Sequence, residues 1–500
     1  RDLPALARPP CSFLLVGAVI GRSPMGTQAS HSASAGAKDS VPLCDAASCR
    51  FCCQVVNTGQ ATYHKKLSFS TLFNASINED TWDPFSLPKG ANAVPLILHF
   101  DVNKTVILSD SISLKGVEDS IREAIAELFW GIIRRDGANV EWEWTPGKPS
   151  IVPPAESAME TDLGAVGTKY NYRQFCKEAI KDSAECKRAI RSFELVANQP
   201  VREEMDKLLE LAVKRMQLDP EFQESEEAKA AGLAGRMYNM LPALFHVVAA
   251  LLRSGRPFAV LFRSFGKDHE RVKAEWNAFC ELRHPVFSDL IKGIGPLDGS
   301  DPLMPDRRIH SVHTLYRDEE GPMLILDRFT NGPSEASWDS WAKAKPKPKA
   351  DTRDGREYAR EVLKAKTVNG YQELQEWMHS HLLRQGTAGI KDDWAWWHAN
   401  GESAYAGKVL PLLGGFGATS QVFFDDNIDI NDPRIVDCRD PNGVAVPAAQ
   451  SLSRFCVKVN PVEALTDHDY FLRKLQSSED RGTPACCPMT CSKDVQLCSL

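Results

Sequence analysis

The sequence predicts an α/β protein built on a Rossmann-like, mostly parallel sheet, and three observations support this fold class. Short apolar runs of strand length are separated by longer stretches of helical periodicity, which is typical of a sheet covered by helices on both faces. The runs are continuously apolar, as in strands that are buried on both sides. Three of the runs end in polar side chains, and they are "AVPLILHF" (93–100), "PFAVLFRSFG" (257–266) and "SQVFFDDNIDIND" (420–432).

The segment between the first two of these strands is predicted to be helical. Residues 116–133 place apolar side chains on one helical stripe, made of Val117, Ile121, Ile125, Leu128 and Ile132. A loop at 146–165 contains Pro and Gly. Helical patterns then dominate from about 171 to 253, and Gly255 is a plausible stop ahead of Pro257.

The remainder of the chain adds further strands and helices. Residues 309–329 read as two strands around a turn at Glu320-Gly321, and helical patterns return at 356–385. Residues 434–440 predict another strand, and residues 466–475 predict a closing helix.

Composition excludes some classes of partner. The chain has 500 residues, a net charge of −7 and a pI of about 6.0, so no global field attracts nucleic acid or anionic lipid, and no nucleic-acid partner is expected. No apolar run reaches the roughly 18 residues of a membrane span, so we expect no transmembrane segment. Oligomeric state is not readable from the sequence.

The first part of the chain leaves two interpretations open. Residues 1–89 are expected to be a largely disordered leader, rich in Ser, Ala and Gly up to about residue 40. If Met25 is the natural start, "MGTQAS" matches a myristoylation pattern with Gly26 exposed. We expect a cytoplasmic protein, whereas an extracellular one would need a signal peptide upstream of Met25.

Cysteines gather near the two ends of the chain. Cys49-x-x-Cys52 resembles half of a zinc site, but no second half with matching spacing follows it. Disulfides or a metal could join the two ends, although reduced cysteines in flexible ends are the favoured interpretation. The two clusters are Cys44, Cys49, Cys52 and Cys53, and Cys486, Cys487, Cys491 and Cys498.

The polar residues at the strand ends predict phosphoryl chemistry. Carboxyl ends of parallel strands meet at one edge of a sheet, so Asp101, Ser264, Asp425 and Asp426 are expected to converge. Clustered carboxylates repel one another unless a cation lies between them, and an all-oxygen site suits Mg²⁺. A carboxylate backed by a metal can attack phosphorus, while a hydroxyl and a Lys hold the phosphoryl oxygens.

Three motifs carry a resemblance to a known family. "HFDVNKTVILSD", "FAVLFRSFG" and "QVFFDDNI" resemble, in order, motifs one, two and four of the haloacid dehalogenase (HAD) superfamily. The resemblance implies a Rossmann-like core, a Mg²⁺ cofactor, and phosphatase or phosphotransferase chemistry on a small phosphorylated compound. It further implies that Asp101 is the nucleophile and a metal ligand, and that Asp425 and Asp426 complete the metal site.

The resemblance assigns roles to three further residues. The backbone carbonyl of Asn103 would also bind the metal, Thr105 would brace the loop of motif one, and Ser264 would bind phosphate. Motif three is a Lys that precedes motif four, and Lys408 in "YAGKVLPLL" is the best candidate. The other lysines considered for this motif are Lys267, Lys364 and Lys391.

The resemblance also suggests a division into domains. A HAD-like core with insertions would comprise residues 90–110 and 257–478, and a helical cap would comprise residues 111–256. Residues 479–500 would form a Cys-containing tail. The cap itself, the tails and residues 268–400 show no recognisable pattern, so the sequence does not predict which compound is the substrate.

One departure from the motif bears directly on function. Phosphatases of the family have Asp at the position of Asn103, where it protonates the leaving oxygen and later activates water. An amide cannot exchange a proton near neutral pH, and general acid–base help is worth roughly 10² to 10⁴ in rate. Two hypotheses therefore remain: a slow Mg²⁺-dependent phosphohydrolase or phosphotransferase, and a non-catalytic HAD-like module that binds a phosphorylated ligand or partner.

Overall fold

The computed structural model divides the chain into two units, residues 1–66 and 67–500, and every residue it describes belongs to the second. The predicted leader and both terminal Cys clusters lie outside the described residues. The structure describes residues 93–108, 116–136, 139–154, 169–233, 237–331, 353–412, 419–440 and 442–482.

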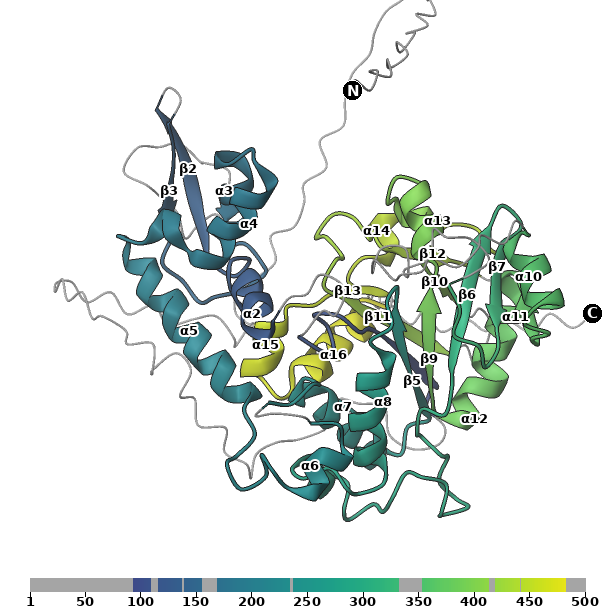
Figure 1. Cartoon of the computed structure of the whole chain (residues 1–500). Coiled ribbons are helices and arrows are strands. Elements are labelled where there is room, and N and C mark those ends of the chain that lie inside the picture. Colours follow the sequence, from purple (N-terminus) through teal and green to yellow (C-terminus); the bar gives the residue numbers. More distant parts are fainter. Residues whose placement is uncertain are drawn as a thin grey trace, which may run out of the picture. The chain divides into compact units, whose positions relative to one another are not determined.

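An eight-stranded, mostly parallel sheet organises the second unit (Figure 1). Its strand order is β13-β11-β1-β5-β9-β6-β7-β8; the first six strands are parallel, and β7 is antiparallel to both of its neighbours, β6 and β8. The predicted α/β class with a mostly parallel sheet is therefore confirmed. The strands are β1 (Leu96–Asp101), β5 (Phe258–Ser264), β6 (Val312–Asp318), β7 (Gly321–Ile325), β8 (Thr367–Asn369), β9 (Thr387–Asp392), β11 (Ser420–Asp425) and β13 (Cys456–Lys458).

The order of the strands reverses beside β1. After β1 the chain builds strands β5 to β9 on one side of it, in the spatial order β5-β9-β6-β7-β8, and then returns to place β11 and β13 on the other side. A crevice at the carboxyl ends of the strands forms where such a reversal occurs, and this is where ligands of open α/β sheets bind. The reversal lies between β1 and β11, which pair in parallel with Phe100 beside Phe424.

Helices cover both faces of the sheet. Leu98 and Phe100 of β1 pack into the largest apolar cluster, together with the helices α7, α8, α15 and α16. Ile97, on the opposite face, packs with α11 and η5. The bounds are α7 (Pro242–Ser254), α8 (His269–Cys280), α11 (Gly370–Trp377), η5 (Met378–Leu382), α15 (Pro461–Thr466) and α16 (Tyr470–Gly482).

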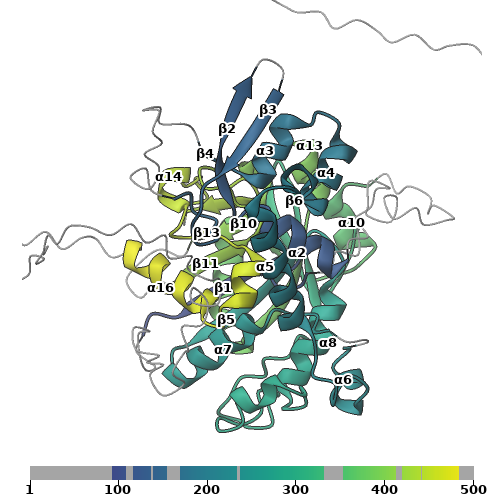
Figure 2. The ribbon, with the colours of Figure 1, turned by 90° about the vertical axis from the view of Figure 1, so that its left-hand side faces the viewer.

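The segment between β1 and β5 is not purely helical, which corrects the prediction of a helical cap. The helix predicted at 116–133 ends at Ile125, and a strand begins at Trp130. This strand, β2, pairs with β3 and β4 in an antiparallel sheet (Figure 2). The elements here are α2 (Val117–Ile125), β2 (Trp130–Asp136), β3 (Asn139–Trp144), β4 (Lys169–Asn171), α3 (Tyr172–Ala179), α4 (Ser183–Ser192), η3 (Glu194–Val196), α5 (Pro200–Met216) and α6 (Glu226–Ala230).

Packing against aromatic side chains explains why the helix stops. The Trp142 ring, on β3, stacks on Phe175 with ring centroids 6.0 Å apart. A Cβ at Gly131 would lie 2.6 Å from Trp142, so only glycine allows β2 and β3 to approach as they do. The β-branched pair Ile132 and Ile133 suits a strand better than a helix.

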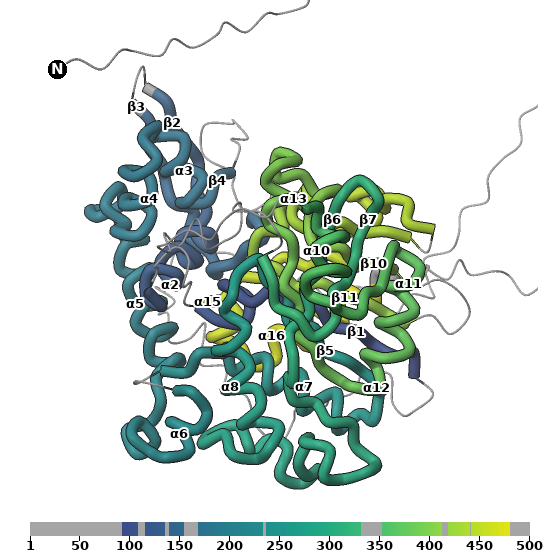
Figure 3. Tube along the Cα trace, turned by 45° about the vertical axis from the view of Figure 1, so that its right-hand side comes forward, coloured from purple at the N-terminus to yellow at the C-terminus, as the bar shows by residue number. Residues whose placement is uncertain are grey.

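The segment between β1 and β5 is joined to the core by the C-terminal helices. Helix α15 contacts both α2 and α5, as the tube shows (Figure 3). Asn460 donates from Nδ2 to the carbonyl oxygen of Ala124 over 3.0 Å, and Glu463 accepts from the amide of Ile151 over 3.2 Å. One apolar cluster runs through all of these helices, so this segment and the sheet share a core.

A small parallel pair, β10 (Lys408–Pro411) and β12 (Val436–Arg439), lies outside the main sheet. Among the described residues, no helix combines the length and the apolar character needed to cross a membrane. The remaining elements are η4 (Phe287–Leu290), α10 (Gly355–Glu361), α12 (Leu383–Gln385), α13 (Trp394–Ala399), η6 (Ala404–Ala406) and α14 (Ala448–Ser451).

Candidate active site

Three carboxylates meet at the reversal of the sheet. Asp101 is the last residue of β1 and Asp425 the last residue of β11, and Asp426 follows directly. Each offers an oxygen, and these oxygens lie within 4.8 Å of one another. Asp101 is 4% exposed and Asp425 is fully buried, whereas Asp426 is half-buried. The described residues thus contain an all-oxygen group that could hold a metal ion.

Lys408 reaches into this group from the small β10–β12 sheet. Its Nζ donates to Asp425 Oδ2 over 2.8 Å and also to Asp101 Oδ1, so one ammonium bridges two strand-end carboxylates. The Nζ also lies 5.1 Å from the ring centroid of Phe265 and 5.7 Å from that of Phe423. These rings exclude water from the ammonium and favour its charge.

The other lysines considered for motif three lie elsewhere. Lys267 and Lys364 are exposed side chains. Lys391 pairs in register with Ser264, on β9, two strands away from Asp101 in the sheet. Lys408 is the lysine that the structure brings to Asp101.

Charges of both signs act on this group. Burial raises the pKa of the Asp101 carboxyl well above its usual value, and Asp425 and Asp426 raise it further, while Lys408 opposes them. Burial raises the pKa of Asp426 to about 6. Burial alone would lower the pKa of Lys408, but Asp101 and Asp425 hold it above the usual value. Lys408 therefore stays protonated and opposes the charges of Asp425 and Asp426 at Asp101, while Lys104 and Lys458 lower the pKa of Asp426. A bound cation would further offset the repulsion among the three carboxylates.

Asn103 is held by two neighbours from the end of β5. Its Nδ2 donates to Asp268 Oδ2 over 2.9 Å, and its Oδ1 accepts from the Ser264 hydroxyl over 3.2 Å. The Ser264 oxygen in turn accepts from the amide of Gly266 over 2.8 Å. The side chain of Asn103 thus orients Ser264, and the Ser264 proton points to an amide rather than to open space.

The loop after β1 is tied to the loop after β11. Thr105 accepts from the amide of Asp426 over 3.0 Å, and Asn427 donates to the Asp426 carboxylate over 2.9 Å. Lys104 adopts a left-handed backbone, with φ of 61°, and its Nζ lies 3.0 Å from Glu123 Oε2. A non-glycine residue in that conformation marks a constrained turn.

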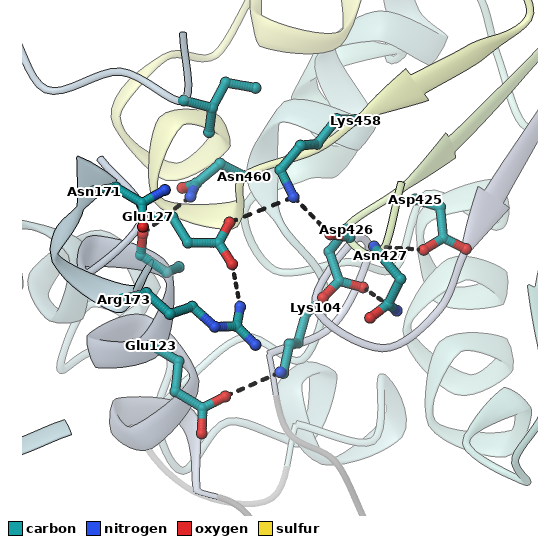
Figure 4. A network of polar contacts seen from close by, with 12 residues as sticks. Lys104, Glu123, Glu127, Asn171, Arg173, Asp425, Asp426, Asn427, Lys458 and Asn460 are labelled. Carbon is teal, nitrogen blue, oxygen red and sulfur yellow. Dashed lines mark hydrogen bonds and ion pairs between the residues drawn. The ribbon is translucent and has the colours of Figure 1, made fainter. Parts of the chain in front are cut away.

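A cleft of about 620 Å³ adjoins the carboxylates and includes Asp426 in its lining. It lies between the segment after β1 and the β11–β12 loop, with side chains from both (Figure 4). Glu127 contacts Arg173 and lies 3.4 Å from Lys458, and Lys458 donates to the carbonyl oxygen of Asp426 over 3.0 Å. Of the three carboxylates, Asp426 lines this cleft, whereas the buried Asp101 and Asp425 are not part of its lining.

No protein-family model, curated protein or solved structure gave a significant match to this chain.

Four residues around the site have no counterpart in the sequence prediction. Asp268 lies four positions after Ser264, and only its distance from Asn103 distinguishes it from other acids in the chain. Lys104 and Asn427 adjoin predicted site residues but lack a pattern of their own. Lys458 ends β13, a three-residue strand too short to be recognised from periodicity.

Proposed function

We propose that this chain is a Mg²⁺-dependent phosphohydrolase or phosphotransferase that acts on a small phosphorylated compound through an aspartyl phosphate at Asp101. The observation that carries the proposal is the bridge from Lys408 to Asp101 and Asp425 within a cluster of three carboxylates. These are also the residues that the motif resemblance assigns to the site, and it selects Lys408 from the sequence alone. The site also lies at the edge of the sheet where ligands of such folds bind.

The donor set fits a hard divalent cation. Asp101, Asp425 and Asp426 supply only oxygen atoms, as Mg²⁺ prefers, and the half-buried Asp426 leaves room for water ligands. A Mg²⁺ ion held there would offset the repulsion among the three carboxylates and polarise a phosphoryl oxygen.

The residues of the chain supply the steps of the reaction. One Asp101 oxygen, held by Lys408, is fixed while the other attacks phosphorus. A P–O bond to Asp101 forms as the bond to the leaving oxygen breaks, and the leaving oxygen departs with the electron pair. Water or an acceptor hydroxyl then attacks the same phosphorus and releases the Asp101 carboxylate. Lys408 would offset charge on the phosphoryl oxygens, and Ser264 would do so if its hydroxyl turned from Asn103 to the phosphoryl group.

Asn103 restricts the compounds that can react. Because its amide cannot protonate the leaving oxygen, turnover should favour esters whose leaving group is stable as an anion. The same residue supports a second candidate function, a module that binds a phosphorylated ligand without turning it over.

The test is turnover of phenyl phosphate and of an activated aryl phosphate, with and without Mg²⁺. We expect slow metal-dependent turnover of the activated ester, and a mass increase on Asp101 after rapid acid quenching. Asp101→Asn should abolish both signals. Asp289→Asn removes an exposed carboxylate from η4, outside the cleft, and should leave both unchanged.

Other results would separate the candidates. Turnover that persists in Asp101→Asn would refute the covalent step. Absence of turnover together with Mg²⁺-dependent binding of phenyl phosphate would favour the non-catalytic module.

A further inference from the structure

The cleft beside the carboxylates is cationic beyond what its own acids balance. Five cationic side chains face three carboxylates across its lining. They come from separate parts of the fold: β4 and α3 on one side, and the β11–β12 loop and β13 on the other. The cations are Lys169, Arg173, Lys177, Arg434 and Lys458, and the carboxylates are Glu127, Asp426 and Asp429.

Three of the cations already have partners within the protein. Arg173 and Lys458 share Glu127, and Lys169 donates to the carbonyl oxygen of Pro154. These contacts hold the walls of the cleft in place, and they leave less of each charge available to a ligand.

The other two cations are available. Within the part of the chain that the structure describes, neither Lys177 nor Arg434 has a side-chain carboxylate within ion-pair distance. Lys177 lies in the last turn of α3, and Arg434 precedes β12. Lys177, Arg173 and Arg434 all line this cleft. Burial lowers the pKa of Lys177, and the charges of Arg173 and Arg434 lower it further, so each arginine repels the Lys177 ammonium. An anion between them would relieve that repulsion.

We propose that the substrate carries a second anionic group, a carboxylate or a further phosphate, and that Lys177 and Arg434 bind it in this cleft. The inference rests on the proposed function, because it takes the phosphoryl group to lie at the carboxylates. Asp426 belongs both to the carboxylate group and to the cleft lining, so the two sites are adjacent. The cleft thereby selects compounds with two anionic groups over phosphate monoesters with one.

The experiment compares two probes on the Asp101→Asn variant with Mg²⁺ present. Phenyl phosphate carries one anionic group, and 4-carboxyphenyl phosphate carries two. We expect the second to bind about ten-fold more tightly by isothermal titration calorimetry, because charge complementarity in a half-enclosed site is worth about that factor. Lys177→Met/Arg434→Gln should remove this preference and leave binding of phenyl phosphate unchanged.

A matched variant controls for net charge. Lys187→Met/Lys214→Met removes two exposed lysines from α4 and α5, outside the cleft, and should keep the ten-fold preference. Equal affinity for the two probes, a preference that survives in the cleft variant, or no binding of either probe would overturn the inference.

Failure of this inference can be distinguished from failure of the proposed function. Turnover by the unmodified protein tests the covalent chemistry, whereas the two affinities test the cleft. A preference without any turnover would retain the cleft site and reject the enzyme. Turnover without a preference would retain the enzyme and reject the cleft site.

Discussion

The side-chain amide of Asn103 contacts both Asp268 and Ser264, and a carboxylate could not make the same two contacts as well. A carboxylate at this position would lie against Asp268, whose Oδ2 is 2.9 Å from the Asn103 nitrogen. Two carboxylates at that distance cannot both ionise without cost. The amide avoids this repulsion and orients Ser264. The amide therefore suits its surroundings, and a carboxylate at position 103 would be better tolerated if Asp268 were changed as well.

The first prediction follows from that contact. Asn103→Asp alone should destabilise the protein by about 1–3 kcal/mol in urea denaturation, because two acids compete for one proton. Asn103→Asp/Asp268→Asn keeps one donor and one acceptor in the contact and should recover most of the loss. If the proposed function holds, the double variant should also turn over phenyl phosphate up to about 10²-fold faster.

Two outcomes would contradict this prediction. Equal stability of the single and double variants would show that the contact with Asp268 does not matter. A double variant that is stable but no faster would show that position 103 does not reach the leaving group.

The second prediction concerns Lys408. Lys408→Met leaves the buried Asp101 and Asp425 without their cation, and removing one partner of a buried ion pair costs about 3–5 kcal/mol. We expect that loss in urea denaturation with EDTA at pH 7.

Added Mg²⁺ should restore part of the stability if the carboxylates bind it, because a ligand that binds only the folded state stabilises it. A variant as stable as the parent in EDTA would contradict the charge argument. Lys364→Met, which removes an exposed lysine, is the control and should change stability by less than about 0.5 kcal/mol.

Single elements place the site by where they end. The apolar strands β1 and β11 end in Asp101 and Asp425, and their parallel pairing brings these ends together. Neighbouring strands are also locked by a buried histidine. His269, at the start of α8, lies 3.3 Å from the carbonyl oxygen of Phe262 on β5 and 3.1 Å from that of Ile390 on β9. Its Nε2 therefore carries the proton and donates to both strands.

The third prediction is a pH dependence from His269. Burial lowers its pKa from 6.5 to about 4, so in this range the unfolded state binds a proton that the folded state does not. The stabilisation from neutral His269 is complete above pH 6.5 and is lost as the pH falls towards 4, by up to about 3 kcal/mol. His269→Gln keeps a donor, and the difference in unfolding free energy between parent and variant should shrink as the pH falls through this window.

Parallel stability curves for the two proteins between pH 4 and 7 would show that His269 is not neutral in the folded state. His381→Gln, which removes an exposed imidazole from η5, is the control and should leave the stability curve unchanged.

At the scale of the whole molecule, the segment between β1 and β5 and the sheet share one apolar core. The largest apolar cluster includes Leu98 of β1, Leu208 of α5 and Leu465 of α15. Two parts that share a core unfold together, since neither buries enough apolar surface alone. The positions of the cleft walls therefore depend on the packing of α15 as well as on the loops that line the cleft.

The fourth prediction tests this coupling. Leu465→Ala empties a site that is 1% exposed and should cost about 2–5 kcal/mol, with a single urea transition shifted as a whole. Hydrogen exchange should lose protection in α5 and β5 together. Two separate transitions would show that the segment folds independently. Val152→Ala, at a side chain that is 58% exposed, should change stability by less than about 0.5 kcal/mol.

Predictability from sequence differed among the elements for physical reasons. The strands at 93–100, 257–266 and 420–432 were predictable because continuous apolar runs mark buried strands. Strand β9 was missed although it lies inside the sheet, because "TAGIKD" mixes polar and small residues that become buried only through their neighbours. The strand at Trp130 was also missed, since local residues there support a helical stripe.

By itself, the sequence determined the class of fold and that the strands at 93–100 and 420–432 lead into acids, because apolar periodicity and the residue after each strand are local properties. Only the tertiary structure decided which strands are neighbours, that Lys408 rather than Lys391 reaches Asp101, that Asp268 holds Asn103, and that a cationic cleft opens beside Asp426. These facts depend on contacts between residues up to 307 positions apart. Strand order and side-chain packing set such contacts, and neither leaves a local trace in the chain.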